Sequence, residues 1–179
     1  MDEYQRIFGL ASILLQHPEK DWFETNELKD LKDEIALIEN QLVKILFKQF
    51  QSYLESTTYL ELCTGYAKTF DFSDKTTLYL TYPLFGENPD RGKALLKLKS
   101  EFYEAGLPIK SEELPDYLPL ILEFCSLVPT KPAQKMLLIH RRSIDNLLKE
   151  LSLIESPYQM ILQACVQTIE DMQRKQKAS

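Results

Sequence analysis

The chain has 179 residues and carries 27 acidic against 21 basic side chains, a formal net charge of −6 at pH 7. This charge repels the nucleic acid backbone and argues against DNA or RNA as the main partner, whereas it attracts basic peptides. No apolar run reaches the roughly 20 residues of a membrane-spanning helix. The acidic start at Asp2 and Glu3 is unlike a secretory signal, so we expect a cytoplasmic protein without membrane insertion.

The first part of the chain has apolar residues at helical spacing in three stretches. The first stretch covers residues 4–15 and ends at His17-Pro18, and the third covers residues 59–70. Between them, one long amphipathic helix is predicted over most of 26–55. Its apolar stripe consists of Leu28, Leu31, Ile35, Ile38, Leu42, Ile45 and Tyr53.

Residues 78–85 read Leu-Tyr-Leu-Thr-Tyr-Pro-Leu-Phe and are apolar nearly all round. Thr and Tyr also favour strands, so the run has features of both element types. Because no second strand exists to pair with it, we predict a buried helix here.

Further helices follow recognisable start and stop signals. Asn88 and Pro89 begin a helix that ends at Gly106. Residues 107–116 then form the longest polar connection. The helices after this connection are predicted over 118–128, over about 132–154 and from Tyr158 onward.

These elements predict an all-α fold of about eight helices. We expect a single domain over residues 1–179, because neither side of the connection at 107–116 could easily bury its apolar stripes alone. The tail at 174–179 is expected to fray. A monomer or a weak homodimer is expected.

The sequence offers few residues for catalysis or metal binding. Its three cysteines, Cys63, Cys125 and Cys165, lie far apart on apolar stripes and are predicted to be small buried hydrophobic residues. The two histidines, His17 and His140, lie on different helices, and surface roles are expected for both. The five glycines form no nucleotide-binding fingerprint. We therefore predict neither an enzyme nor a site for a cofactor or a metal.

A recognition surface is the remaining functional prediction. Pro115 and Pro119 restrict the backbone around Asp116, which is expected to hold its carboxylate beside an apolar helix. An apolar groove with acidic side chains at its edge would accept a basic, amphipathic peptide helix, and Asp116→Ala should weaken that binding without unfolding the chain. The alternatives are a loop that only orients a helix, and tyrosines that belong to the core. The predicted peptide-binding residues are Asp116, Tyr117, Leu118, Ile121, Leu122, Glu123, Tyr79 and Tyr82.

Three blocks of sequence, 70–82, 86–96 and 113–124, resemble a known family in their order and spacing. The Thr-Leu-Tyr-Leu-Thr-Tyr run and the Leu-Pro-Asp-Tyr-Leu-Pro loop are its most specific motifs. The family is that of the NarJ-type nitrate reductase molybdenum cofactor assembly chaperones, within the TorD/DmsD group of redox-enzyme maturation proteins. The resemblance covers about residues 1–170.

This resemblance implies an all-helical, TorD-like chaperone that is not an enzyme. Such a protein would bind the N-terminal segment of the nitrate reductase α subunit, assist insertion of the molybdenum cofactor and delay docking on the membrane subunit. Asp116 and Tyr117 match the loop pair implicated in peptide binding in the group. The group often has histidine where Tyr117 stands, and a tyrosine does not titrate near neutral pH.

Three other functions are compatible with the sequence. The first is a chaperone that binds the twin-arginine leader of another molybdoenzyme, such as a dimethyl sulfoxide or trimethylamine oxide reductase. The second is a helical enzyme whose site leaves no motif, and the third is a scaffold that dimerises through the stripe at 28–53.

Overall fold

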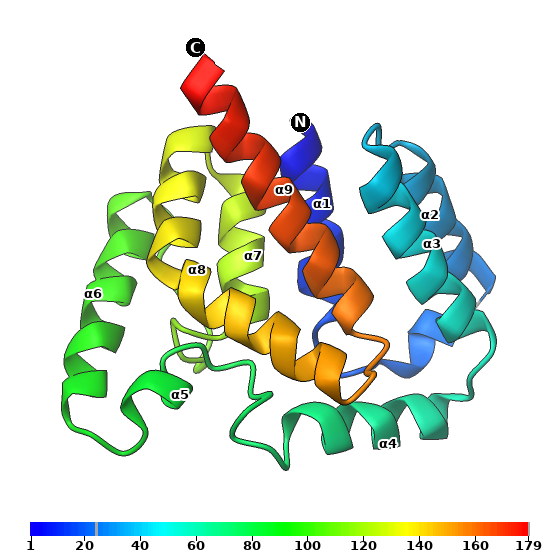
Figure 1. Ribbon diagram of the computed structural model, residues 1–179, viewed down its shortest axis with the longest axis horizontal. Coiled ribbons are helices and arrows are strands. Elements are labelled where there is room, and N and C mark those ends of the chain that lie inside the picture. The colour runs from blue at the N-terminus through cyan, green and yellow to red at the C-terminus, as the bar shows by residue number, and fades with distance from the viewer. Residues whose placement is uncertain (24, 179) are drawn as a thin grey trace.

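The computed structural model describes residues 1–23 and 25–178, with side chains for residues 1–22 and 29–176. This part of the chain contains helices and no strand, which confirms the predicted all-α class (Figure 1). Within it, none of the helices combines the length and apolarity needed to cross a bilayer. The elements are α1 (Glu3–Leu14), the short 3₁₀ helix η1 (Lys20–Phe23), α2 (Thr25–Ala36), α3 (Gln41–Glu55), α4 (Tyr59–Phe70), α5 (Tyr82–Phe85), α6 (Asp90–Glu104), α7 (Leu118–Leu127), α8 (Thr130–Leu153) and α9 (Gln159–Ala178).

The centre of the molecule consists of α1, α7, α8 and α9, and α1 packs against both α7 and α9 (Figure 1). The hydroxyl of Ser12 on α1 donates a hydrogen bond to the carbonyl of Pro119 on α7, at 2.7 Å. α3 packs on α9, α2 lies beside α3, and α5 and α6 form the opposite edge. The fully buried core side chains include Phe8, Leu15, Phe47, Phe50, Leu118, Ile121, Leu122, Ile144, Ile161 and Leu162.

The prediction of one long helix over 26–55 is wrong, because the helix is interrupted between α2 and α3. Asn40 caps the start of α3, and its side chain accepts a hydrogen bond from the backbone N–H of Val43 at 3.2 Å. The carboxylate of Glu3 on α1 also accepts the backbone N–H groups of Glu39 and Asn40, each at 2.7 Å. This contact from a distant helix stabilises the break. The side chain of Leu28 lies outside the described residues.

The prediction of a buried helix over 78–85 is also wrong. Only Tyr82–Phe85 form a helical turn, α5, while Tyr79 forms an isolated antiparallel bridge with Tyr117 of the proline loop. The N–H of Leu80 donates to the carbonyl of Asp116 at 3.0 Å, and the N–H of Leu118 donates to the carbonyl of Leu78 at 2.8 Å. The pairing partner is therefore a loop that has no strand pattern of its own.

The other predicted helices are confirmed as elements, with small differences at their ends. The largest difference is at the C-terminus, where the tail that was expected to fray is helical to Ala178. Ser179 lies outside the described residues. Helix ends commonly differ by a few residues from a sequence-based assignment, because the last turn depends on local capping contacts.

The thiols differ in their accessibility, which gives a first testable prediction. Cys125 and Cys165 are buried as predicted, and burial raises the pKa of the Cys165 thiol to about 12, whereas Cys63 is only half-buried. We expect iodoacetamide to alkylate Cys63 in the native protein and the other two only after unfolding, because the thiolate is the reactive form. Peptide mapping by mass spectrometry measures this, and rapid native labelling of Cys125 would contradict it.

Candidate functional site

The pairing of residues 78–80 with the proline loop brings two predicted site residues together. Tyr79 and Tyr117 face each other across the single antiparallel bridge, with ring centroids 5.2 Å apart. Both side chains are partly exposed. The hydroxyl of Tyr117 also lies 3.5 Å from that of Tyr66 on α4, which is buried. This pair of rings therefore joins the two paired segments to α4.

Asp116 lies beneath this pair and is 0% exposed, so the prediction that its carboxylate faces a partner is wrong for this conformation. Its Oδ2 atom accepts hydrogen bonds from both the backbone N–H and the hydroxyl of Thr81. The guanidinium of Arg91 on α6 donates to the same oxygen at 3.2 Å. Asp116 is thus a buried anchor that holds residues 78–81 and α6 against the start of α7.

Three further predicted site residues are also inaccessible. Leu118, Ile121 and Leu122 are each 0% exposed, because these positions of α7 are covered by the packing of α1 and α8 around that helix. The expectation that they line an open groove is therefore wrong. Their apolar spacing is that of core residues.

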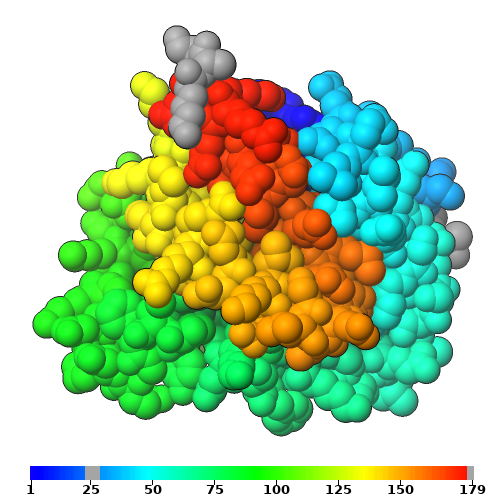
Figure 2. Space-filling model, in the orientation of Figure 1, coloured from blue at the N-terminus to red at the C-terminus, as the bar shows by residue number. Residues whose placement is uncertain are grey.

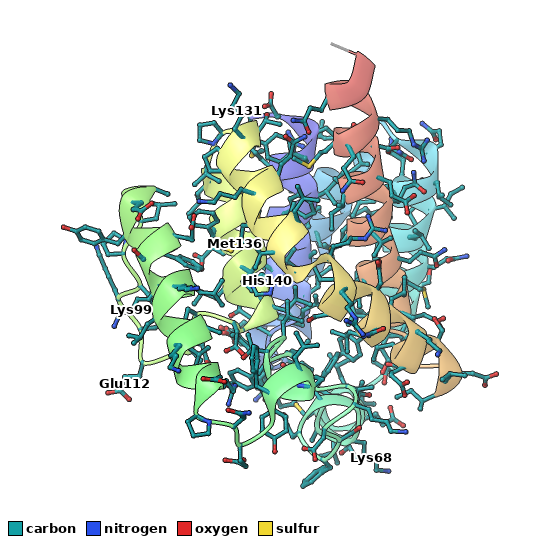
Figure 3. The ribbon with its side chains drawn as sticks, turned by 60° about the vertical axis from the view of Figure 1, so that its left-hand side comes forward. Lys68, Lys99, Glu112, Lys131, Met136 and His140 are labelled. Carbon is teal, nitrogen blue, oxygen red and sulfur yellow. The ribbon has the colours of Figure 1, made fainter. Side chains whose placement is uncertain are left out.

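The prediction of a surface position for His140 on α8 is also wrong. Its side chain is 3% exposed (Figure 3). Burial lowers the pKa of His140 to about 4, and the carboxylate of Asp116 partly opposes this shift. Neither Nε2 of His140 nor Oδ1 of Asp116 has a hydrogen-bond partner among the described residues. Each unpaired buried polar group of this kind costs about 1–3 kcal/mol.

The accessible part of the predicted site forms a surface that we call the tyrosine surface. Tyr79 donates its hydroxyl to Glu113 at 2.8 Å, and Tyr82 donates its hydroxyl to Glu87 at 3.4 Å. The carboxylates of Asp74 and Glu87 raise the pKa of Tyr82. Acidic groups therefore surround the exposed rings. The tyrosine surface consists of Tyr79, Tyr82 and Tyr117, with Asp74, Glu87 and Glu113 at its edge.

This surface already holds one cation of the protein itself. The guanidinium carbon of Arg91 lies 5.3 Å from the centroid of the Tyr82 ring, a distance at which a cation is attracted to an aromatic face. Phe72 and Leu84, which neighbour the surface in sequence, are 82% and 52% exposed. Aromatic faces, carboxylates and exposed apolar side chains together suit a polypeptide that is partly basic and partly apolar.

Glu123 was predicted at the same site but lies elsewhere. It is exposed on α7 and lines a groove of about 570 Å³ between α6, the connection at 106–111 and α7. We call this the α6–α7 groove. Its apolar lining consists of Phe102, Leu107, Ile109, Leu120, Phe124 and Leu127.

Sequence reasoning did not include Thr81 and Arg91 in the site. Arg91 forms an ion pair with Asp116. Arg91 and Asp116 are 25 positions apart, so no local pattern links them. In the described part of the chain, no three His, Cys, Asp or Glu side chains gather as a metal site.

Comparison with known proteins gives consistent matches along the chain. Residues 24–153 match the family model described as nitrate reductase delta subunit. The chain is 32% identical over 168 residues to a probable nitrate reductase molybdenum cofactor assembly chaperone NarJ of Bacillus subtilis, covering 94% of this chain and 90% of that protein. It is 29% identical over 162 residues to the probable chaperone NarW of Escherichia coli, covering 90% and 67%. A nitrate reductase-like protein NarX of Mycobacterium tuberculosis is 28% identical over 167 residues, which make up 25% of that protein.

Proposed function

Because the chain belongs to the nitrate reductase delta subunit family, we propose that it is a chaperone that binds the N-terminal segment of the nitrate reductase α subunit. The similar proteins NarJ and NarW are molybdenum cofactor assembly chaperones, and the family is not one of catalytic enzymes. In this proposal the chaperone holds the α subunit in the cytoplasm. It assists insertion of the molybdenum cofactor and delays docking on the membrane subunit until insertion is complete.

The tyrosine surface is the observation that carries the proposal. Its three partly exposed rings offer apolar contact area, and its carboxylates offer partners for basic side chains. Burying roughly 500 Å² of apolar peptide surface would contribute on the order of 12 kcal/mol at ~25 cal/mol per Å². Ordering a flexible segment offsets much of this gain, which leaves a dissociation constant in the micromolar to nanomolar range.

Reversing charge at the edge of the tyrosine surface tests the proposal. We expect Asp74→Lys combined with Glu87→Lys to weaken binding of a synthetic peptide of the α-subunit N-terminal segment by about tenfold at low salt, because each edge carboxylate contributes roughly 0.7 kcal/mol. Isothermal titration calorimetry measures the affinity. The loss should shrink as ionic strength rises, because exposed charges are screened by salt.

The matched control changes the net charge equally at a distant place. Asp33→Lys combined with Glu39→Lys alters two exposed acids near α2 and α3, on the side of the molecule away from α5 (Figure 1). This variant should bind the peptide with nearly unchanged affinity. Equal losses in both variants would remove the tyrosine surface from the binding site. A wild-type protein that does not bind the peptide at all would overturn the proposed function itself.

A further inference from the structure

α6 is loosely attached to the rest of the protein. It lies at the outer edge of the molecule, next to α8, as the green segment of Figure 2 shows. Only Leu98 and Phe102 among its 15 residues are buried. We call residues 87–105, which contain α6, the α6 arm. A helix with so few buried side chains has little apolar contact to hold it in place.

A glycine with positive φ stands at each end of the α6 arm. Gly86 has φ 53° and Gly106 has φ 78°, a backbone region that other residues rarely adopt. A Cβ atom at either position would have no other atom within 4 Å, so the neighbouring space is open. Hinges are short segments that absorb large changes of φ and ψ, and these two positions can do so without a steric clash.

The contacts of the arm with the body are few. At its start, Arg91 donates to the Thr81 hydroxyl at 3.0 Å and to Asp116 at 3.2 Å. Near its end, the Phe102 ring packs on that of Phe124, with centroids 4.7 Å apart. An exposed ion pair joins Glu101 to Lys135 on α8 at 2.6 Å.

Space lies between the arm and both of its neighbours. The α6–α7 groove of about 570 Å³ separates the arm from α7, and a second cavity of about 320 Å³ lies between the arm and α8. Phe124 lines both cavities, and Met136 lies on α8 beside the second one (Figure 3). The arm therefore does not close tightly on either helix.

The closed position of the arm also leaves polar atoms unpaired. Oδ1 of Asp116 and Nε2 of His140 are both buried without a hydrogen-bond partner. Displacing Arg91 would uncover the carboxylate of Asp116 and let water or a new donor reach it. This gain would offset part of what the closed contacts contribute.

We propose that the α6 arm is a lid that moves about Gly86 and Gly106, and that its opening uncovers Leu120 and Phe124 of α7 and the carboxylate of Asp116 for the client polypeptide. The partner fitted by the uncovered surface is an apolar segment with a basic side chain, which takes the place of Arg91 on Asp116. The role of the client in this proposal rests on the proposed function. The motion of the arm does not.

Hydrogen exchange of the protein alone tests the motion. We expect backbone amides of α6 to exchange at least about tenfold faster than those of α8. Arg91→Gln should raise the exchange rate of the α6 amides by about another tenfold. The control is Lys93→Gln, which removes a cation from the same helix but from an exposed pair with Asp90. Lys93→Gln should leave the exchange rates of the α6 amides unchanged. Exchange in wild-type α6 as slow as in α8 would overturn the lid, as would equal acceleration of all helices by Arg91→Gln.

A zero-length cross-link tests the link to client binding. A carbodiimide activates the Glu101 carboxylate, and the Lys135 amine then forms an amide with it while the reagent leaves as a urea. The link would hold α6 on α8. The control Lys135→Arg keeps the ion pair but forms no amide under these conditions.

We expect the cross-linked protein, verified by peptide mapping, to lose affinity for the α-subunit peptide by at least about tenfold, because a binding-competent state of low population weakens apparent affinity. Carbodiimide-treated Lys135→Arg should retain its affinity. Equal binding by both treated proteins would overturn the role of the lid in client binding. If the untreated protein does not bind the peptide, the proposed function fails, and hydrogen exchange alone decides whether the arm moves.

Discussion

Replacing Asp116 with Ala is expected to lower the free energy of unfolding by about 3 kcal/mol, because the substitution removes the acceptor of a buried ion pair. Thr81 and Arg91 would both lose the oxygen to which they donate. Urea denaturation measures the change. From the sequence we expected Asp116→Ala to weaken peptide binding without unfolding the chain, and the complete burial of the carboxylate changes this expectation.

Two variants separate the effect of the buried pair from that of losing a charge. Asp90→Ala removes a carboxylate from the exposed pair with Lys93 and should cost no more than about 0.5 kcal/mol. Asp116→Asn keeps an oxygen that can accept a hydrogen bond from Thr81. Its loss of unfolding free energy should therefore lie between those of Asp116→Ala and Asp90→Ala. If Asp116→Ala and Asp90→Ala unfold at the same urea concentration, Asp116 does not anchor α6.

Acidification from pH 7 to pH 4 is expected to remove about 3 kcal/mol of stability through His140 alone. The folded protein holds the pKa of this imidazole at about 4, chiefly through burial, whereas an unfolded chain has its ordinary value near 6.5. Between these two values the unfolded state binds more protons. Stability from the neutral, buried His140 is therefore complete above pH 6.5 and is lost as the pH falls toward 4.

Substituting His140 itself tests this prediction. His140→Gln should reduce the loss between pH 7 and pH 4 by about 3 kcal/mol, even if it lowers stability at neutral pH. Parallel pH profiles of the wild type and His140→Gln, measured by urea denaturation, would contradict a neutral buried imidazole.

The burial of Asp116 changes how the site works. A carboxylate at the surface would contact a client directly, whereas the buried one positions the groups that remain accessible. It fixes residues 78–81 against residues 116–118, and this pairing sets Tyr79 beside Tyr117. The same carboxylate holds α6 through Arg91. One residue therefore connects the shape of the tyrosine surface with the position of the α6 arm.

The sequence by itself determined the fold class and most of the helices. Apolar spacing predicted α1, α4 and α7, and the pair Asn88-Pro89 with Gly106 bracketed α6. The motifs at 77–82 and 114–119 indicated the family that the comparisons then showed. These features are local, because periodicity and capping depend on residues within one or two turns of each other. The single domain and the oligomeric state stay predictions.

Only the tertiary structure decided the break before Asn40, the pairing of Tyr79 with Tyr117 and the burial of Asp116 and His140. Each depends on a group far away in sequence. Glu3 stabilises the break, the proline loop pairs with residues 78–80, and Arg91 neutralises Asp116. An acidic residue beside an apolar stripe has the same local pattern whether it faces water or an arginine 25 positions away. Packing brings such partners together, and it therefore decides which side chains remain accessible to a client.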